Sequence, residues 1–193
     1  MTPDHAKAPR SSSPARAILD DAQNTFRTYK RLADRALEQV DDASFVRTID
    51  DESNSLALIV KHISGNLRSR WTDFLTSDGE KPARRRDQEF EQRDADSRAS
   101  LMKAWEDGWQ HVFDSIGSLR EDEILAIVTI RGEPHTVVQA INRSLAHTAS
   151  HVGQIIFLAK HLQSSAWQTL SIPRGKSDEY LARPAAAGKP APK

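Results

Sequence analysis

The chain has 193 residues, in which 27 basic side chains balance 27 acidic ones, and it contains no cysteine. This length suits one domain that buries its own core, and the lack of cysteine excludes thiolate metal sites, disulfide frameworks and cysteine nucleophiles. Because the formal net charge is zero, no overall field attracts the protein to nucleic acid or to an anionic membrane, and we expect a small-molecule substrate or a protein partner instead.

Both ends of the sequence are rich in proline, serine and alanine and show no hydrophobic periodicity. We therefore expect flexible tails at residues 1–13 and 178–193 around one domain at residues 14–177, and we assign no site role to His5. The N-terminus lacks an apolar stretch of signal-peptide length, and no apolar run is long enough to span a bilayer, so we expect a cytoplasmic protein.

Two helices are predicted in the first part of the chain. The first begins at Ser13-Pro14, where serine is a favourable cap and proline suits the first turn. Its apolar residues recur three to four positions apart until Asp41-Asp42 ends the pattern. The second helix starts around Ser53 to Ser55 and extends to about Leu75.

His62 and Asn66 lie one turn apart on the flank of the second helix's apolar stripe. A lone histidine at such an edge is more often bonded to a backbone carbonyl than to a metal ion. Arg70 lies nearer the apolar face and needs a hydrogen-bond acceptor if it is buried.

The polar stretch from Thr76 to Ala95 is broken by Gly79 and Pro82 and is long for a tight connection between antiparallel helices. It is typical of a crossover between two successive helices that run parallel. Three arginines occupy positions 84–86, and acidic residues follow directly. A mixed cluster of this kind is usually a solvated or ion-paired surface, so it does not indicate a nucleic-acid site.

The third helix is predicted from about Ser97 to Leu119, and we expect its tryptophans in the core. The run from Ile124 to Ile130 is rich in β-branched residues, which favours a short extended segment that ends at Arg131-Gly132.

The fourth helix begins near Thr136, where Gln139 three positions later completes a capping box, and it reaches about Leu162. His135 therefore lies outside this helix. The segment from Trp167 to Ser177 is too apolar for a tail, and we expect it to fold back onto the helices.

His147 and His151 are four residues apart on the fourth helix, so both imidazoles project from one face. Arg143 and Gln154 share that polar flank. A pair with this spacing is by itself usually an accident of a helix surface, and a third ligand from elsewhere would change that interpretation.

Together these patterns predict an all-α protein, a four-helix bundle with a long crossover between the second and third helices. Facing helices could then bring His62, His147 and His151 to one ion. Three neutral nitrogen ligands leave coordination positions open, as in catalytic rather than structural metal sites. Imidazole ligands suit zinc, nickel, copper or iron, and such an ion lowers the pKa of a bound water or thiol.

Five segments between Leu19 and Ser177 carry a resemblance to a known family: Lys61–Asn66, Arg70–Lys81, Arg131-Gly132, Ala146–Gln154 and Ile172–Ser177. They resemble the DinB-like superfamily, also called YfiT-like metal-dependent hydrolases, and within it the DUF1572 branch. The resemblance implies the up-down-down-up bundle, a metal ion bound by His62, His147 and His151, and often a homodimer. Other branches of the superfamily are thiol transferases that use bacillithiol, mycothiol or glutathione, and some members are called DNA-damage-inducible.

Our first hypothesis is a divalent-metal-dependent enzyme, a thiol transferase or hydrolase, whose ion activates a thiol or water against a small electrophile. Zinc or nickel is the preferred ion and manganese or iron a further candidate, with a low-molecular-weight thiol as a possible cosubstrate. No catalytic residue is assigned. Asn66, Arg143 and Gln154 would orient the substrate, and Arg174 would bind an anionic group. The alternative is a non-enzymatic metal-binding helical-bundle protein with a stress or sensor role.

Overall fold

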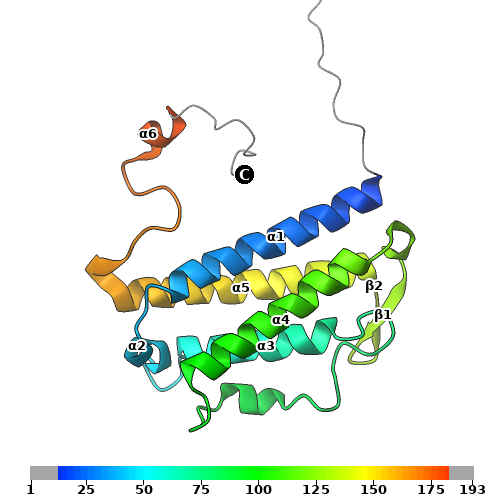
Figure 1. Ribbon diagram of the computed structural model, residues 1–193, viewed down its shortest axis with the longest axis horizontal. Coiled ribbons are helices and arrows are strands. Elements are labelled where there is room, and N and C mark those ends of the chain that lie inside the picture. Colours follow the sequence, from blue (N-terminus) through cyan, green and yellow to red (C-terminus); the bar gives the residue numbers. More distant parts are fainter. Residues whose placement is uncertain (1–12, 183–193) are drawn as a thin grey trace, which may run out of the picture.

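A computed structural model describes residues 13–182, in which four main helices and a small β-hairpin form the fold (Figure 1). The main helices are α1 (Pro14–Leu37), α3 (Leu56–Trp71), α4 (Arg98–Ser118) and α5 (Val137–Gln163). The hairpin consists of β1 (Ile127–Ile130) and β2 (Glu133–Thr136). The short elements are α2 (Asp42–Val46), α6 (Ser177–Leu181) and the 3-10 helices η1 (Arg86–Phe90), η2 (Glu121–Glu123) and η3 (Ser164–Ala166).

The predicted tail positions 1–12 and 183–193, and His5 with them, lie outside the described residues. Residues 178–181, also expected in the C-terminal tail, belong to α6, where every side chain is exposed. Between residues 13 and 182, no helix combines the length and the apolar character needed to cross a membrane.

Side-chain caps begin each main helix close to its predicted start. The hydroxyl groups of Ser13, Ser55 and Ser97 accept hydrogen bonds from the third residue after them, and Thr136 forms the predicted capping box with Gln139. The first helix ends at Leu37 rather than near Asp41, because Asp41 caps the separate helix α2. The second ends at Trp71 rather than Leu75, because the backbone turns extended at Thr72.

The core is formed where α3 packs against α4 and α5, and where α1 packs against α5. Trp105 and Trp109 are fully buried, as predicted for the tryptophans of this helix, and the ring of Trp109 lies 6.2 Å from that of Phe26, edge to face. Gly108 allows α4 to approach α3 closely, because a Cβ atom there would lie only 3.1 Å from the carbonyl oxygen of Ser64. This packing fixes the position of α3, which carries His62.

The hairpin adds a β element to a chain that we expected to be all-α. The extended segment predicted from Ile124 to Ile130 is confirmed only from Ile127 onward, as β1, and the residues after Gly132 form a second strand that the sequence pattern did not predict. Antiparallel pairing joins Ile127 to Thr136 and Ile130 to Glu133. Arg131 and Gly132 both have positive φ angles, of 56° and 76°, as a two-residue hairpin turn with matching twist requires.

The segment after α5 returns to the helices only in part. Trp167 and Leu170 pack against the core, and Gln168 exchanges hydrogen bonds with Gln39 of the loop after α1. From residue 171 to residue 182 every side chain is exposed. The predicted fold-back of residues 167–177 is therefore wrong beyond Leu170, because the remainder lacks apolar side chains spaced to reach the core.

Asp78 ties the connection after α3 to the hairpin turn. Its carboxylate accepts hydrogen bonds from the backbone N–H groups of Glu80, at 2.6 Å, Gly132, at 2.7 Å, and Arg131, at 2.8 Å. These donors, Glu80 first, lower the pKa of Asp78 to about 2. The turn that carries Arg131 is thus held by a charged acceptor.

We expect Asp78→Asn to lower the melting temperature by about 2–4 °C at pH 6, because an amide nitrogen cannot accept from Gly132. A carboxyl whose folded pKa is lowered stabilises the protein above its unfolded pKa of about 3.9 and loses this effect as the pH falls through about 2. The difference between wild type and variant should therefore shrink from pH 4 downward in melts followed by circular dichroism. Asp94→Asn, at an exposed position of the same connection, is the control. A difference that is constant with pH would contradict this role of Asp78.

Candidate metal centre

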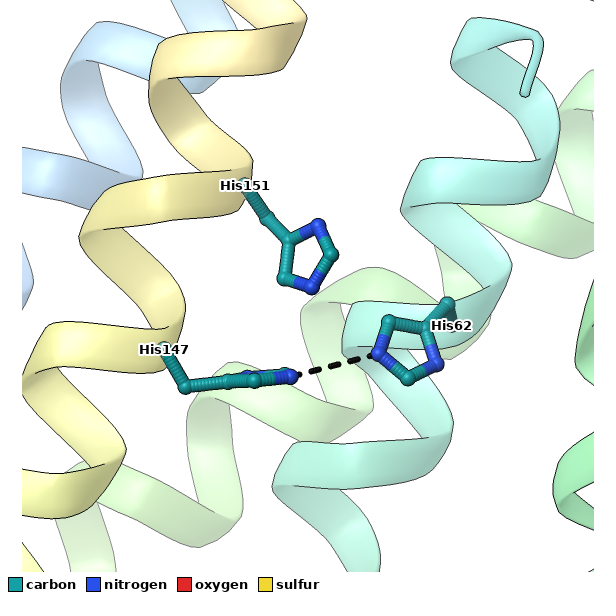
Figure 2. A group of neighbouring side chains, drawn as sticks. All are labelled: His62, His147 and His151. Carbon is teal, nitrogen blue, oxygen red and sulfur yellow. Dashed lines mark hydrogen bonds between the residues drawn. The ribbon is translucent and has the colours of Figure 1, made fainter. Parts of the chain in front are cut away.

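Three imidazoles converge between α3 and α5. His62 comes from α3 and His147 and His151 from successive turns of α5, and Figure 2 shows their rings turned toward one another. One ring nitrogen of each lies within 4.8 Å of the other two. The Nε2 atoms of His62 and His147 are 3.3 Å apart. The convergence predicted for these three side chains is present in the structure.

His62 is more deeply buried than its predicted position, on the flank of the apolar stripe of the second helix, suggested. Its side chain is only 5% exposed, because η1 covers this face of α3 and the ring of Phe90 lies 4.7 Å from the imidazole. Nor is it bonded to a backbone carbonyl, the more common arrangement for a lone histidine. Its Nδ1 atom lies 2.9 Å from a carboxylate oxygen of Glu89.

Glu89 is a buried carboxylate that determines the tautomer of His62. Arg84 donates to both of its oxygens at 2.8 Å. Burial acts to raise the pKa of Glu89, but the hydrogen bonds from Arg84 and His62 hold it below its ordinary value. An ionised carboxylate only accepts hydrogen bonds, so Nδ1 of His62 carries the proton and Nε2 presents a lone pair toward the other histidines.

Gln154 plays the corresponding part for His151. Its side-chain oxygen accepts a hydrogen bond from Nδ1 of His151 at 2.7 Å, which leaves Nε2 of that ring unprotonated. Burial lowers the pKa of His151. Burial, followed by the charges of the other two histidines, also lowers the pKa of His147 to about 4. His147 and His151 are therefore neutral near pH 7, the state in which imidazole binds metal.

The donor set fits a divalent ion. Nitrogen ligands that share a tetrahedral zinc ion at about 2.0–2.1 Å lie about 3.3 Å from each other, and the two closest Nε2 atoms here have this separation. Within residues 13–182, Nδ1 of His147 is buried without a hydrogen-bond partner. Because Nδ1 makes no hydrogen bond within these residues, the polar contact that orients the ring is that of Nε2, which lies 3.3 Å from Nε2 of His62. Three imidazole nitrogens could hold an ion and leave positions open.

A cavity of about 390 Å³ opens beside the three histidines, which form part of its wall. Its apolar lining comes from α3, the α3–α4 connection and β1: Trp71, Phe74, Phe90 and Ile130. Five arginines also line it: Arg70, Arg84, Arg86, Arg131 and Arg143. An exchangeable ligand bound to a metal ion at the three histidines would thus lie in a cavity of small-molecule size.

The four residues predicted to bind substrate fall in different places. Asn66, which is buried, and Arg143 line the cavity. Gln154 does not line it and instead bonds to His151. Arg174 is not among the lining residues either, and it lies in the exposed segment after Leu170.

Sequence reasoning missed Glu89 and Arg84, which support His62 from 27 and 22 positions further along the chain. The charged run that contains them was interpreted as surface, and its ion pairing is confirmed, but the pairs are buried against α3. One signal was available in Gly65, since a glycine inside a helix often marks a close approach. A Cβ atom at this position would overlap the carboxylate of Glu89.

We expect Gly65→Ala to displace Glu89 and to weaken zinc binding by about ten- to a hundredfold, although no ligand is changed. The substitution by itself favours the helix by about 0.5–1 kcal/mol, so weaker binding could not be attributed to a weaker helix. Competition titration with a chromophoric chelator measures the affinity. Gly153→Ala on α5 is the matched control, because a Cβ atom there meets nothing within 4 Å. Equal affinities in the two variants would show that Glu89 does not support the site.

No curated protein shows significant similarity to this chain. The model of the family described as "Protein of unknown function (DUF1572)" matches residues 13–176. This match covers most of the chain and confirms the resemblance that the five sequence segments carried. The chain therefore belongs to the DUF1572 family, which is placed in the DinB-like superfamily.

Proposed function

We propose that this protein is a divalent-metal-dependent enzyme that directs a thiol or a water molecule against a small electrophile, as a thiol transferase or a hydrolase. The observation that carries the proposal is the set of three converging imidazoles that line a cavity. His62, His147 and His151 would hold the ion, with zinc or nickel as the first choice and manganese or iron next. The ion would supply Lewis acidity and would lower the pKa of a coordinated thiol or water.

The surrounding side chains would prepare this site for chemistry. Glu89 keeps the Nδ1 proton on His62, and Gln154 does the same for His151, so both Nε2 lone pairs point inward. Phe74 and Phe90 give the cavity an apolar wall that restricts water. Asn66, whose side chain lines the cavity, would orient the substrate by hydrogen bonding.

The proposal extends to the arrangement of the whole protein. It comprises one domain over residues 14–177 with up-down-down-up helices, assembly as a homodimer, a cytoplasmic location, and a low-molecular-weight thiol as cosubstrate. Gln154 and Arg174 are weaker substrate-binding candidates than Asn66 and Arg143, because neither lines the cavity.

The test uses protein that is stripped of metal, reloaded with zinc, nickel or manganese, and assayed with thiol plus electrophile and with ester and amide substrates. We expect turnover only in the loaded protein, and a loss of about a hundredfold or more in His151→Ala, because two remaining imidazoles hold an ion far less tightly. His161→Ala is the matched control, since His161 is exposed further along the same helix.

Two outcomes would contradict the proposal. Turnover that survives chelation would show that the reaction does not use the ion. Absence of turnover, together with a large fall in melting temperature on chelation, would instead support the non-enzymatic metal-binding protein, because an ion bound only to the folded state stabilises it by mass action.

A further inference from the structure

The cavity beside the three histidines carries an excess of positive charge. Five arginines line it, and no aspartate or glutamate does. The carboxylates paired with these arginines are Glu80, Glu89 and the exposed Asp87, which lies 4.0 Å from Arg86, and all three lie outside the lining. Three carboxylates can neutralise at most three of the five guanidinium groups. A divalent ion on the histidines would add further positive charge to the same space.

A single arginine, Arg84, is paired with most of this negative charge. Arg84 is paired with both oxygens of Glu89 and also donates to Glu80 at 3.2 Å. The carboxylate of Glu80 is therefore shared among Arg84, Arg70 and Arg131. It lies 3.2 Å from Arg70 and 3.0 Å from Arg131. Three guanidinium groups that share these two carboxylates retain both positive charge and free donors.

Within residues 13–182, two of these arginines keep donors that no protein group accepts from. Arg70 is largely buried, with 12% of its side chain exposed, and its Nη1 atom is buried with no hydrogen-bond partner among residues 13–182. A buried donor without an acceptor is costly unless a ligand supplies one. Within residues 13–182, the side chain of Arg143 makes one hydrogen-bond contact, between its Nη1 atom and Nε2 of His135 at 3.4 Å.

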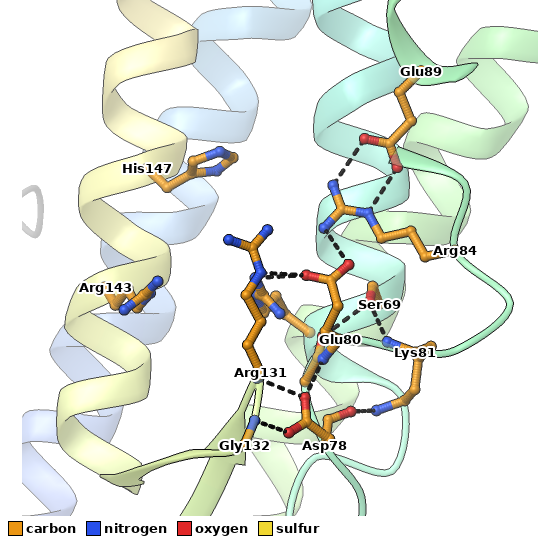
Figure 3. Close-up of polar contacts among 12 residues, drawn as sticks. Ser69, Asp78, Glu80, Lys81, Arg84, Glu89, Arg131, Gly132, Arg143 and His147 are labelled. Carbon is orange, nitrogen blue, oxygen red and sulfur yellow. Dashed lines mark hydrogen bonds and ion pairs between the residues drawn. The ribbon is translucent and has the colours of Figure 1, made fainter. Parts of the chain in front are cut away.

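These arginines come from three different elements and still reach one space. Arg70 lies near the end of α3, Arg131 on the hairpin turn and Arg143 on α5. In Figure 3, Arg131 extends from the hairpin turn toward the level of His147, and Arg143 lies against α5 on the same side as His147. The carboxylate of Asp78 accepts hydrogen bonds from the backbone N–H groups of Arg131 and Gly132. These bonds fix the position of the turn from which the Arg131 side chain extends.

We propose that Arg70, Arg131 and Arg143 form an oxyanion-binding site, and that the substrate carries a carboxylate or phosphate group that binds there. The planar guanidinium fork matches both groups with paired hydrogen bonds. The cavity volume of about 390 Å³ limits the ligand to a small molecule. This assignment deepens the proposed function, since it orients the reactive end of the substrate toward the three histidines, while the anion site itself needs no metal.

The experiment measures anion binding to the metal-free full-length protein, so that its result does not depend on metal loading or catalysis. Inorganic phosphate and succinate are titrated separately by calorimetry at low ionic strength. We expect at least one probe to bind, with an affinity that falls as sodium chloride is added. The stronger probe identifies which oxyanion the site prefers.

Arg143→Gln should weaken that binding by about tenfold or more, because the variant loses a charge-assisted pair of hydrogen bonds. Arg143→Lys should recover only part of the affinity, since an ammonium group lacks the planar fork. Arg31→Gln, which makes the same change at an exposed position of α1 outside the cavity, should bind as the wild type does.

Failure of both probes to bind the wild-type protein would overturn the proposal, and so would equal affinity in Arg143→Gln and Arg31→Gln. Melting temperatures of all variants check that each is folded. A protein that binds the anion but shows no metal-dependent turnover would keep this site while refuting the proposed enzyme.

Discussion

The buried chain of hydrogen bonds from His62 through Glu89 to Arg84 is the constraint on which the site depends. A carboxylate at the 7% exposure of Glu89 would be costly in isolation, and it is stable here because Arg84 pairs with both of its oxygens and His62 donates to one. The same bonds orient the imidazole. Gly65 supplies the space in which the carboxylate approaches α3. Removal of Glu89 would leave Nδ1 of the buried His62 without its acceptor and Arg84 with Glu80 alone.

This chain also links the histidines to the arginine-lined part of the cavity. Arg84 bonds to Glu89 on one side and to Glu80 on the other, and Glu80 in turn holds Arg70 and Arg131. Figure 3 shows the sequence of contacts from Glu89 down to the hairpin turn. The positive charge gathered here contributes to the low pKa of His147, which keeps that ring neutral and available to a metal ion. The two halves of the cavity are thus supported by one network.

Local patterns in the sequence predicted the helix starts and the face shared by His147 and His151, because caps and helical periodicity act over a few residues. The meeting of His62 with that pair was an inference from bundle geometry and from the family resemblance, and the structure confirms the cluster. The role of Glu89 could not be predicted, since Glu89 lies 27 positions beyond His62, in the connection after α3, which has no periodicity. The second strand was missed because its charged and proline residues carry no strand pattern.

The central claim is that three imidazoles hold one divalent ion with positions left open, and X-ray absorption spectroscopy of protein purified without a histidine tag tests it most directly. We expect one ion per chain, with scattering from three imidazole rings at about 2.0–2.1 Å if the ion is zinc, and additional light-atom ligands. A protein without bound metal after exposure to zinc and nickel, or an ion surrounded by oxygen ligands alone, would contradict the account.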